Sequence, residues 1–402
     1  MDKMVVLAGS LDTKGPEFAF VNDLIEQKGL NTFVVDFGVM GEPPFKPDID
    51  RYEVAAAGDG LLERLGDGDH KDEAMQVMAD GLAVVMRRLF DEGKLDGVLG
   101  MGGGGNTSVV TAGMRTLPVG VPKLMVSTLG GGDVSSYAGT RDITFMPSIV
   151  DVAGINSISR QIYANAAAAI AGMVTVDHAA VDEKPLITAS MFGNTTEAVG
   201  RARSKLEQQG YEVLIFHATG TGGRTMESLI SDGLIEGSLD ITTTELADFI
   251  CDGIFSAGAE RCLAASLAGT PAVIVPGCVD MVNYWGIDRV PEAFRDRNLY
   301  QWNPNMTLMR TNVEENRQMG ELIAAAANEA TAPVAIVLPL NGVSMLDSPG
   351  GRFWDPEADQ ACFQAIKDNV RENIQVIEMD HNINDPEFAD RCAELLLEMM
   401  QD

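Results

Sequence analysis

Glycine-rich segments that carry polar side chains are the parts of this 402-residue chain best suited to chemistry. The first segment consists of Gly102, Gly103, Gly104, Gly105, Asn106 and Thr107. Glycine lets backbone N–H groups approach an anion closely, and a helix that begins there adds positive partial charge. Asn106 and Thr107 supply side-chain donors, although no Lys-Ser/Thr pair follows as it would in a Walker A loop. We expect this segment to bind a phosphate group; the alternative is a flexible connection between a strand and a helix.

A second glycine-rich segment follows the next apolar run and contains Gly131 and Gly132, with Asp133 directly after them. Neighbouring parallel strands end at one edge of a sheet, so this segment is expected to face the same ligand. For Asp133 two interpretations stay open: a ligand of Mg²⁺ or of a ribose hydroxyl, and the N-cap of a helix.

The loop after the first apolar run contains Asp12, Thr13 and Lys14. Lys14 is a point charge suited to a phosphate, and Asp12 is a candidate for a ribose hydroxyl or for Mg²⁺. The alternative is an ordinary helix start, with Asp12 or Thr13 as the cap and Pro16 near the first helical position.

A third glycine-rich segment lies in the second half of the chain and contains Gly220, Gly222 and Gly223. Arg224 follows it, and its planar guanidinium can donate two hydrogen bonds to one anion. His217 precedes it and is a candidate acid or base, or else a structural hydrogen-bonding group. With Asn283, which follows a later strand, His217 and Arg224 form the set of candidate catalytic residues.

Short apolar runs alternate with helical patterns along the chain, which indicates parallel sheets covered by helices on both faces. At about 150 residues per domain, the length favours two α/β domains. The pattern breaks near residues 177–185, so we predict two Rossmann-like lobes, 1–180 and 181–402, with a cleft between them. Residues 282–309 are expected to be irregular. The last helix, 386–400, has two expected positions, on its own lobe or packed back on the first.

The composition excludes several classes of protein. The net charge of −30 repels nucleic acid and anionic membranes, and no run of 18 apolar residues predicts a membrane span. The five cysteines form no CxxC pair and the four histidines no HxxxH pair, which argues against a structural zinc site and a disulfide framework. With no signal peptide visible, these features favour a cytoplasmic location.

Three segments together resemble one known family. They are LAGSLDTKGPE at 7–17, the glycines at 102–105 and HATGTGG at 217–223. They are similar to the ATP-binding domain family of the tomato mosaic virus resistance protein and its bacterial and fungal relatives, over essentially the whole chain. The resemblance implies two Rossmann-like lobes, ATP as ligand, and self-association as a dimer or larger. In the plant protein a TIM barrel follows this region, so a separately encoded TIM-barrel protein is an expected partner.

Three functions therefore stay open. The first is an ATP-binding protein, with Mg²⁺ as a companion ion, whose glycine-rich loops hold the nucleotide near the cleft. The second is an enzyme that acts on a small phosphorylated or carboxylated metabolite. The third is a regulatory or interaction protein with a structural nucleotide. NAD is a weaker rival to ATP. Asp36 ends the second strand, where a ribose-binding acid would lie, but the first loop lacks the GxGxxG motif of NAD sites.

Overall fold

The computed structural model describes residues 3–62, 71–177 and 184–401. The chain divides into two compact units, residues 1–180 and 181–402. The predicted boundary, between residues 180 and 181, lies outside the described residues.

The first unit is built on a five-stranded parallel sheet, and its strands are ordered β2-β1-β3-β4-β5. Their bounds are β1 (Met4–Gly9), β2 (Asn31–Asp36), β3 (Gly97–Gly102), β4 (Lys123–Ser127) and β5 (Thr144–Pro147). This order is that of flavodoxin-like doubly wound sheets. The predicted fold class, a mainly parallel α/β architecture, is confirmed.

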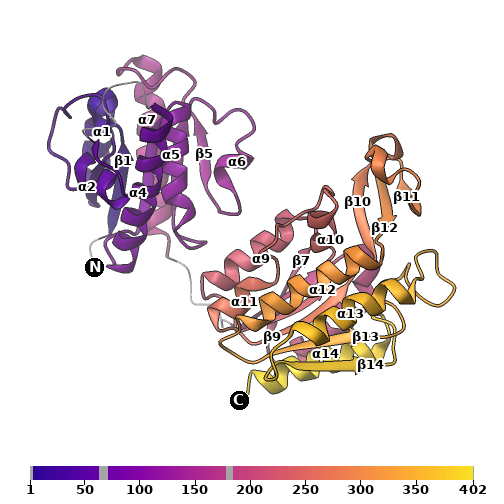
Figure 1. The fold of residues 1–402 in the computed structure, drawn as a ribbon. Helices are drawn as coiled ribbons and strands as arrows, with labels where there is room; N and C mark the ends of the chain where they lie inside the picture. Colours follow the sequence, from indigo (N-terminus) through magenta and orange to yellow (C-terminus); the bar gives the residue numbers. More distant parts are fainter. Residues whose placement is uncertain (1–2, 63–70, 178–183, 402) are drawn as a thin grey trace. The chain divides into compact units, whose positions relative to one another are not determined.

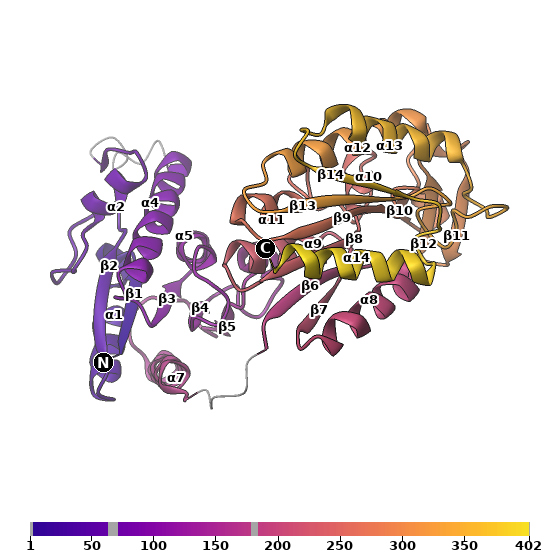
Figure 2. The same ribbon diagram turned by 90° about the horizontal axis from the view of Figure 1, so that it is seen from below.

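Helices cover both faces of the first sheet, as Figures 1 and 2 show. One face packs against α1 (Leu11–Glu26) and α7 (Ser157–Thr175). The other packs against α2 (Arg51–Ala57), α4 (Lys71–Asp91) and α5 (Gly104–Arg115). A one-turn helix, α6 (Ser135–Ala138), lies between β4 and β5 in the sequence. Because both faces are covered, β3 and β4 are buried throughout, which explains their almost continuous apolar runs.

The second unit is built on a six-stranded parallel sheet with the order β14-β13-β9-β8-β6-β7. Its strands are β6 (Leu186–Met191), β7 (Glu212–His217), β8 (Gly237–Thr242), β9 (Ala272–Gly277), β13 (Val334–Pro339) and β14 (Gln375–Met379). Read from β7, the order again places the first strand of the unit between the second and the third. Each unit is therefore doubly wound, with the same order over its first five strands.

Helices cover the two faces of the second sheet unequally (Figure 2). One face packs against α8 (Thr196–Gln208) and α14 (Pro386–Met399). The other packs against α9 (Thr221–Ser231), α10 (Glu245–Ile250), α11 (Leu263–Ala268), α12 (Val313–Asn328) and α13 (Pro356–Asn369). The last helix, α14, buries its apolar side against α8 and the sheet of its own unit.

The segment expected to be irregular, residues 282–309, instead forms most of a small antiparallel sheet. Its strands are β10 (Met281–Trp285), β11 (Leu299–Asn303) and β12 (Met306–Arg310), in the order β10-β12-β11. Figure 1 shows it beside the parallel sheet of the second unit. A tight turn joins β11 to β12, where the Asn303 side chain accepts from the Asn305 N–H at 2.8 Å. The prediction was wrong because aromatic and polar residues are mixed along these strands, which hides the apolar pattern.

Candidate functional site

A cavity of about 480 Å³ lies in the first unit beside the carboxyl ends of β1 and β3. The helix after β1 packs on one face of the sheet, and the helix after β3 packs on the other. The two connections therefore diverge and leave a crevice between them. In doubly wound sheets this switch point is where ligands bind.

The N-terminus of α5 forms one wall of this cavity. The N-cap residue is Gly103, which has no side chain to cap the first-turn N–H groups. The N–H groups of Gly104, Gly105 and Asn106 are in the first turn, where a helix has no intrahelical partners for them. Gly104 and Gly105 are exposed, and all four residues line the cavity. The wall therefore presents N–H donors without a partner among the described residues, at the positive end of a helix.

Hydrogen bonds hold the loops after β1 and β3 together. Asn106 donates from Nδ2 to Ser10 Oγ at 2.9 Å and to the carbonyl of Met101 at 3.2 Å. Gly102 has a φ of 153°, and a Cβ there would lie 2.5 Å from the Cβ of Asn106. Glycine at position 102 is thus required for Asn106 to reach the loop after β1.

Thr107 faces the core and not the cavity. Its hydroxyl is buried, donates to the carbonyl of Gly103 at 2.9 Å and lies 2.7 Å from Ser127 Oγ. The predicted role of Thr107 as a side-chain donor to the ligand does not fit this position.

The loop after β1 supplies the charged side chains of the cavity. The backbone of Lys14 leaves the helical conformation, and its Nζ donates to the carbonyl of Val152 at 2.7 Å. Asp12 Oδ2 accepts from the N–H groups of Met40 and Gly41 at 2.7 and 3.1 Å. Its other oxygen, Oδ1, is buried and has no partner among the described residues. Thr13 Oγ1 lies 3.1 Å from Ser10 Oγ.

Apolar side chains form the rest of the cavity wall. They come from the segment after β2 and from α4, and are Phe37, Val39, Met40, Ala74, Met75 and Met78. Asp151 adds a second carboxylate. The sequence analysis did not predict these residues as site residues; Met75 and Met78 lie on the apolar side of α4, which packs on the sheet.

Asp36 is a buried residue that holds the backbone of neighbouring loops. It is fully buried, and its Oδ1 accepts from the N–H groups of Leu11 and Gly38, each at 2.9 Å. Burial raises the pKa of Asp36 above its ordinary value, while these two hydrogen bonds lower it. A carboxylate with no exposed surface cannot reach a ribose, so the rival interpretation as an NAD site loses its acidic residue.

The second glycine-rich segment does not line the cavity. Gly131, Gly132 and Asp133 are exposed, and Gly132 donates to the carbonyl of Leu129 at 2.9 Å. Asp133 Oδ1 accepts from the N–H of Ser135 at 2.9 Å, and hydrogen bonding to Ser135 lowers the pKa of Asp133. Of the two interpretations of Asp133, the local capping of a turn fits this geometry.

Within residues 3–62, 71–177 and 184–401, no group of three or more His, Cys, Asp or Glu side chains is arranged to hold a metal ion. The two metal candidates, Asp12 and Asp133, therefore do not belong to a preformed protein cage.

The third glycine-rich segment binds a side chain of the protein itself. Glu245 Oε1 accepts from the N–H groups of Gly220 and Gly223 at 2.6 and 3.1 Å. A Cβ at Gly223 would lie 2.2 Å from Glu245 Oε2. Gly220 and Gly223, expected to hold a ligand, thus bind a buried carboxylate of the protein itself, and Gly222, the third expected ligand residue, lies against the backbone of His217.

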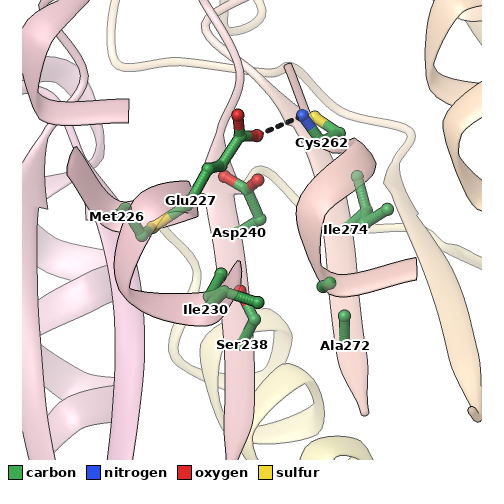
Figure 3. Close-up of a pocket in the computed structure, with 9 residues that line it drawn as sticks. Met226, Glu227, Ile230, Ser238, Asp240, Cys262, Ala272 and Ile274 are labelled. Carbon is green, nitrogen blue, oxygen red and sulfur yellow. Dashed lines mark hydrogen bonds between the residues drawn. The ribbon is translucent and has the colours of Figure 1, made fainter. Parts of the chain in front are cut away.

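Arg261 neutralises the carboxylates behind this loop. The fully buried guanidinium bonds to Glu245 Oε2 and Asp240 Oδ2, each at 2.5 Å, and to Glu227 at 3.1 Å. Figure 3 shows Glu227 beside Asp240, with its carboxylate on the N–H of Cys262. Burial raises the pKa of Glu227 to about 7. The adjoining cavity of about 10 Å³ has room for at most one water molecule, so this cluster serves the fold.

The three candidate catalytic residues have separate partners. His217 lines a small pocket and stacks on Phe192, with ring centroids 5.2 Å apart. Arg224 Nη1 donates to the carbonyl of Ser256 at 2.8 Å. Asn283 is fully buried, and its Nδ2 donates to Asp248 Oδ2 at 2.7 Å.

Family models match both units. Residues 3–179 match the N-terminal domain, and residues 184–400 the C-terminal domain, of the Uncharacterised protein family (UPF0261). The chain belongs to this family. The resemblance stated from the loops is thereby confirmed, because the UPF0261 relatives include the tomato protein.

Two UPF0261 relatives show how far the similarity extends. A UPF0261 protein of Clostridium tetani is 47% identical over 100% of both chains. A ToMV resistance protein of Solanum lycopersicum is 36% identical over 98% of this chain, which spans 55% of that protein. Among solved structures, a UDP-N-acetylglucosamine 2-epimerase from Rickettsia bellii covers 100% of this chain and 96% of its own. At 11% identity and a TM-score of 0.24, that likeness carries no argument.

Within the described parts of this UPF0261 chain, no helix combines the length and the apolar character needed to cross a membrane.

Proposed function

We propose that the first unit binds ATP in the cavity beside β1 and β3. The observation that carries this proposal is the N-terminus of α5, whose unpaired first-turn N–H groups open onto the cavity. The volume of about 480 Å³ is within the range usual for small-molecule sites.

The phosphates of ATP would lie against the residues from Gly103 to Asn106. Lys14 lines the same cavity and now donates to a neutral backbone carbonyl. A phosphate oxygen is a stronger, charged acceptor, so the flexible Lys14 side chain would turn to it. This local attraction is needed because the protein as a whole is strongly anionic.

The base and ribose would lie against the remaining walls. The apolar side chains of Phe37, Val39 and Met75 suit the faces of an adenine ring. Asp12 Oδ1, buried without a partner among the described residues, suits a ribose hydroxyl or Mg²⁺. Mg²⁺ is often bound by one or two carboxylates together with phosphate oxygens, and Asp12 and Asp151 both line the cavity.

Titration calorimetry with MgATP tests this proposal. A Lys14→Ala variant should bind about ten to a hundred times more weakly, because it loses a charged hydrogen bond of about 1.5–3 kcal/mol. Lys28→Ala is the matched control, since Lys28 is exposed and outside the cavity. Equal MgATP affinity in the wild type and Lys14→Ala, or no heat of binding in the wild type, would contradict the proposal.

The family resemblance supports three further proposals about the context of this protein. They are self-association as a dimer or larger, a separately encoded TIM-barrel partner, and a cytoplasmic location. Light scattering after size-exclusion chromatography tests the first. A monomer at micromolar concentration, with and without MgATP, would contradict it.

A further inference from the structure

A second pocket lies in the other unit, beside the carboxyl ends of β6 and β7. Its volume is about 190 Å³. Phe192 and the 3₁₀ turn η1 (Gly193–Thr195) follow β6, and His217 ends β7. Side chains of the small antiparallel sheet, among them Trp302 of β11 and Leu308 of β12, complete the wall. The pocket is thus at the same end of a doubly wound parallel sheet as the proposed nucleotide site.

Aromatic rings dominate the wall of this pocket. Phe192 is stacked on His217 and meets Phe255 edge-on, with ring centroids 6.3 Å apart. Trp302 adds the largest ring and is 42% exposed. Such rings pack favourably against other planar rings in offset or edge-to-face geometry.

One buried polar atom in the wall lacks a partner. Asn194 is only 2% exposed, and its Nδ2 lies 3.3 Å from the sulfur of Met281. Its Oδ1 is buried and has no hydrogen-bond partner among the described residues. Buried polar atoms are nearly always paired, so the unpaired oxygen of Asn194, a residue that lines the pocket, is an acceptor that a donor on a ligand would satisfy.

Charge and size narrow the class of ligand. Among the described residues that line the pocket there is no Lys, Arg, Asp or Glu, and Arg224 points to a backbone carbonyl instead. A cationic ligand would find no carboxylate in this wall, and an anionic ligand would find no Lys or Arg there and would also be repelled by the net charge of −30. An apolar cavity of about 150 Å³ admits a benzene ring, so about 190 Å³ suits one six-membered ring with small substituents.

We propose that this pocket binds a neutral, planar six-membered ring carrying an N–H or O–H donor, a class that includes pyrimidine and pyridine-carboxamide rings. The ring lies among Phe192, Phe255 and Trp302, and its donor bonds to Asn194 Oδ1. This site belongs to the second unit and does not depend on ATP binding by the first.

Saturation-transfer NMR with uracil and with nicotinamide tests the site in the full-length protein. Gly193→Leu adds a bulky side chain to a residue that lines the pocket, without backbone strain, because a Cβ at Gly193 meets nothing within 4 Å and its φ is not in the left-handed region. Gly200→Leu is the matched control at an exposed position of α8, where a Cβ likewise meets nothing within 4 Å. We expect the wild type and Gly200→Leu to bind alike, and Gly193→Leu to bind about ten times more weakly or not at all.

Two results would overturn the site: no saturation transfer from the wild type to either probe at millimolar concentration, or equal binding by Gly193→Leu. MgATP titrations of the same variants should be unchanged. A loss of ring binding with intact MgATP binding therefore separates this proposal from the proposed function.

Asn194→Leu tests the hydrogen bond within the pocket. It should weaken uracil binding about tenfold and leave toluene, which has no donor, equally or more tightly bound. A parallel change in the affinity for uracil and for toluene would show that Asn194 has only a structural role. Gly193→Leu keeps the location of the site testable should Asn194→Leu fail to fold.

Discussion

The buried pair of Asp248 and Asn283 shows how one residue makes stability depend on pH. The Asp248 carboxylate accepts from Asn283 Nδ2 at 2.7 Å and from the N–H groups of Phe255 and Asn283 at 3.1 and 3.2 Å. Burial outweighs these bonds and raises the pKa of Asp248 from 3.8 to about 7. The folded state therefore keeps a proton that the unfolded state has already released.

This raised pKa predicts that Asp248 makes the fold less stable as pH rises from about 4 to about 7. Below that range both states are protonated, and within it the native state binds more protons, so stability falls with pH. Between pH 5 and pH 8 the loss should be about 2–3 kcal/mol.

Asp248→Asn should remove this pH dependence, which urea unfolding at several pH values would measure. Asn283 Oδ1 is buried and has no partner among the described residues, so it could accept from the new amide if Asn283 turns. If the difference in stability between the variant and the wild type were constant from pH 5 to pH 8, Asp248 would not be the group that titrates.

The sequence predicted which residues share a site where their position at the end of a strand was enough to place them. The ends of neighbouring strands share a sheet edge, and Asp12, Lys14 and Asn106 do line one cavity. Glu245 and Arg261 could not be predicted, because their pairing spans 16 residues and nothing in the local sequence signals it.

At the scale of elements, the turn from β3 into α5 is the most constrained part of the proposed nucleotide site. Its direction depends on the φ of 153° at Gly102 and on the contact between Gly102 and Asn106. The first-turn N–H groups point into the cavity only if this turn keeps its shape.

Gly102→Ala should therefore destabilise the first unit by about 1–3 kcal/mol and weaken MgATP binding together with it. Gly131→Ala is the control, because Gly131 has an ordinary φ and a Cβ there meets nothing within 4 Å. It should change stability by no more than about 0.5 kcal/mol. Thermal unfolding with and without MgATP measures both effects, and equal behaviour of the two variants would refute the role of this turn.

The parallel elements were more predictable than the others. The runs at β1, β3 and β9 are short, apolar and followed by glycine or a helix, which is the pattern of a buried strand. The sequence pattern does not predict strand β8, because it contains Ser238 and Asp240; the buried Asp240 is paired with Arg261 and also accepts from Ser190. Tertiary pairing thus overrides the local apolar signal.

At the scale of the whole molecule, the net charge of −30 repels the proposed ligand, MgATP, which is itself an anion. Long-range repulsion slows the approach of such a ligand, and salt screens it over about 10 Å at 0.1 M. The association rate of MgATP should therefore rise as sodium chloride increases from low concentration to about 0.1 M. Stopped-flow measurements would check this, and a falling rate would mean that the local charge of Lys14 governs the approach.

The buried Glu245 carboxylate has a consequence for the second unit. It occupies a site formed by the N–H groups of Gly220 and Gly223, and such a site is also suited to a free anion. Glu245→Ala should lose about 3–5 kcal/mol of stability, because Arg261 loses one of its three carboxylate partners and two glycine N–H groups lose their acceptor. Added acetate should then recover part of it in a concentration-dependent way. The exposed Glu260→Ala should show no acetate effect. Such chemical complementation would show that the first turn of α9 binds small carboxylates. In the native protein the Glu245 side chain occupies this site.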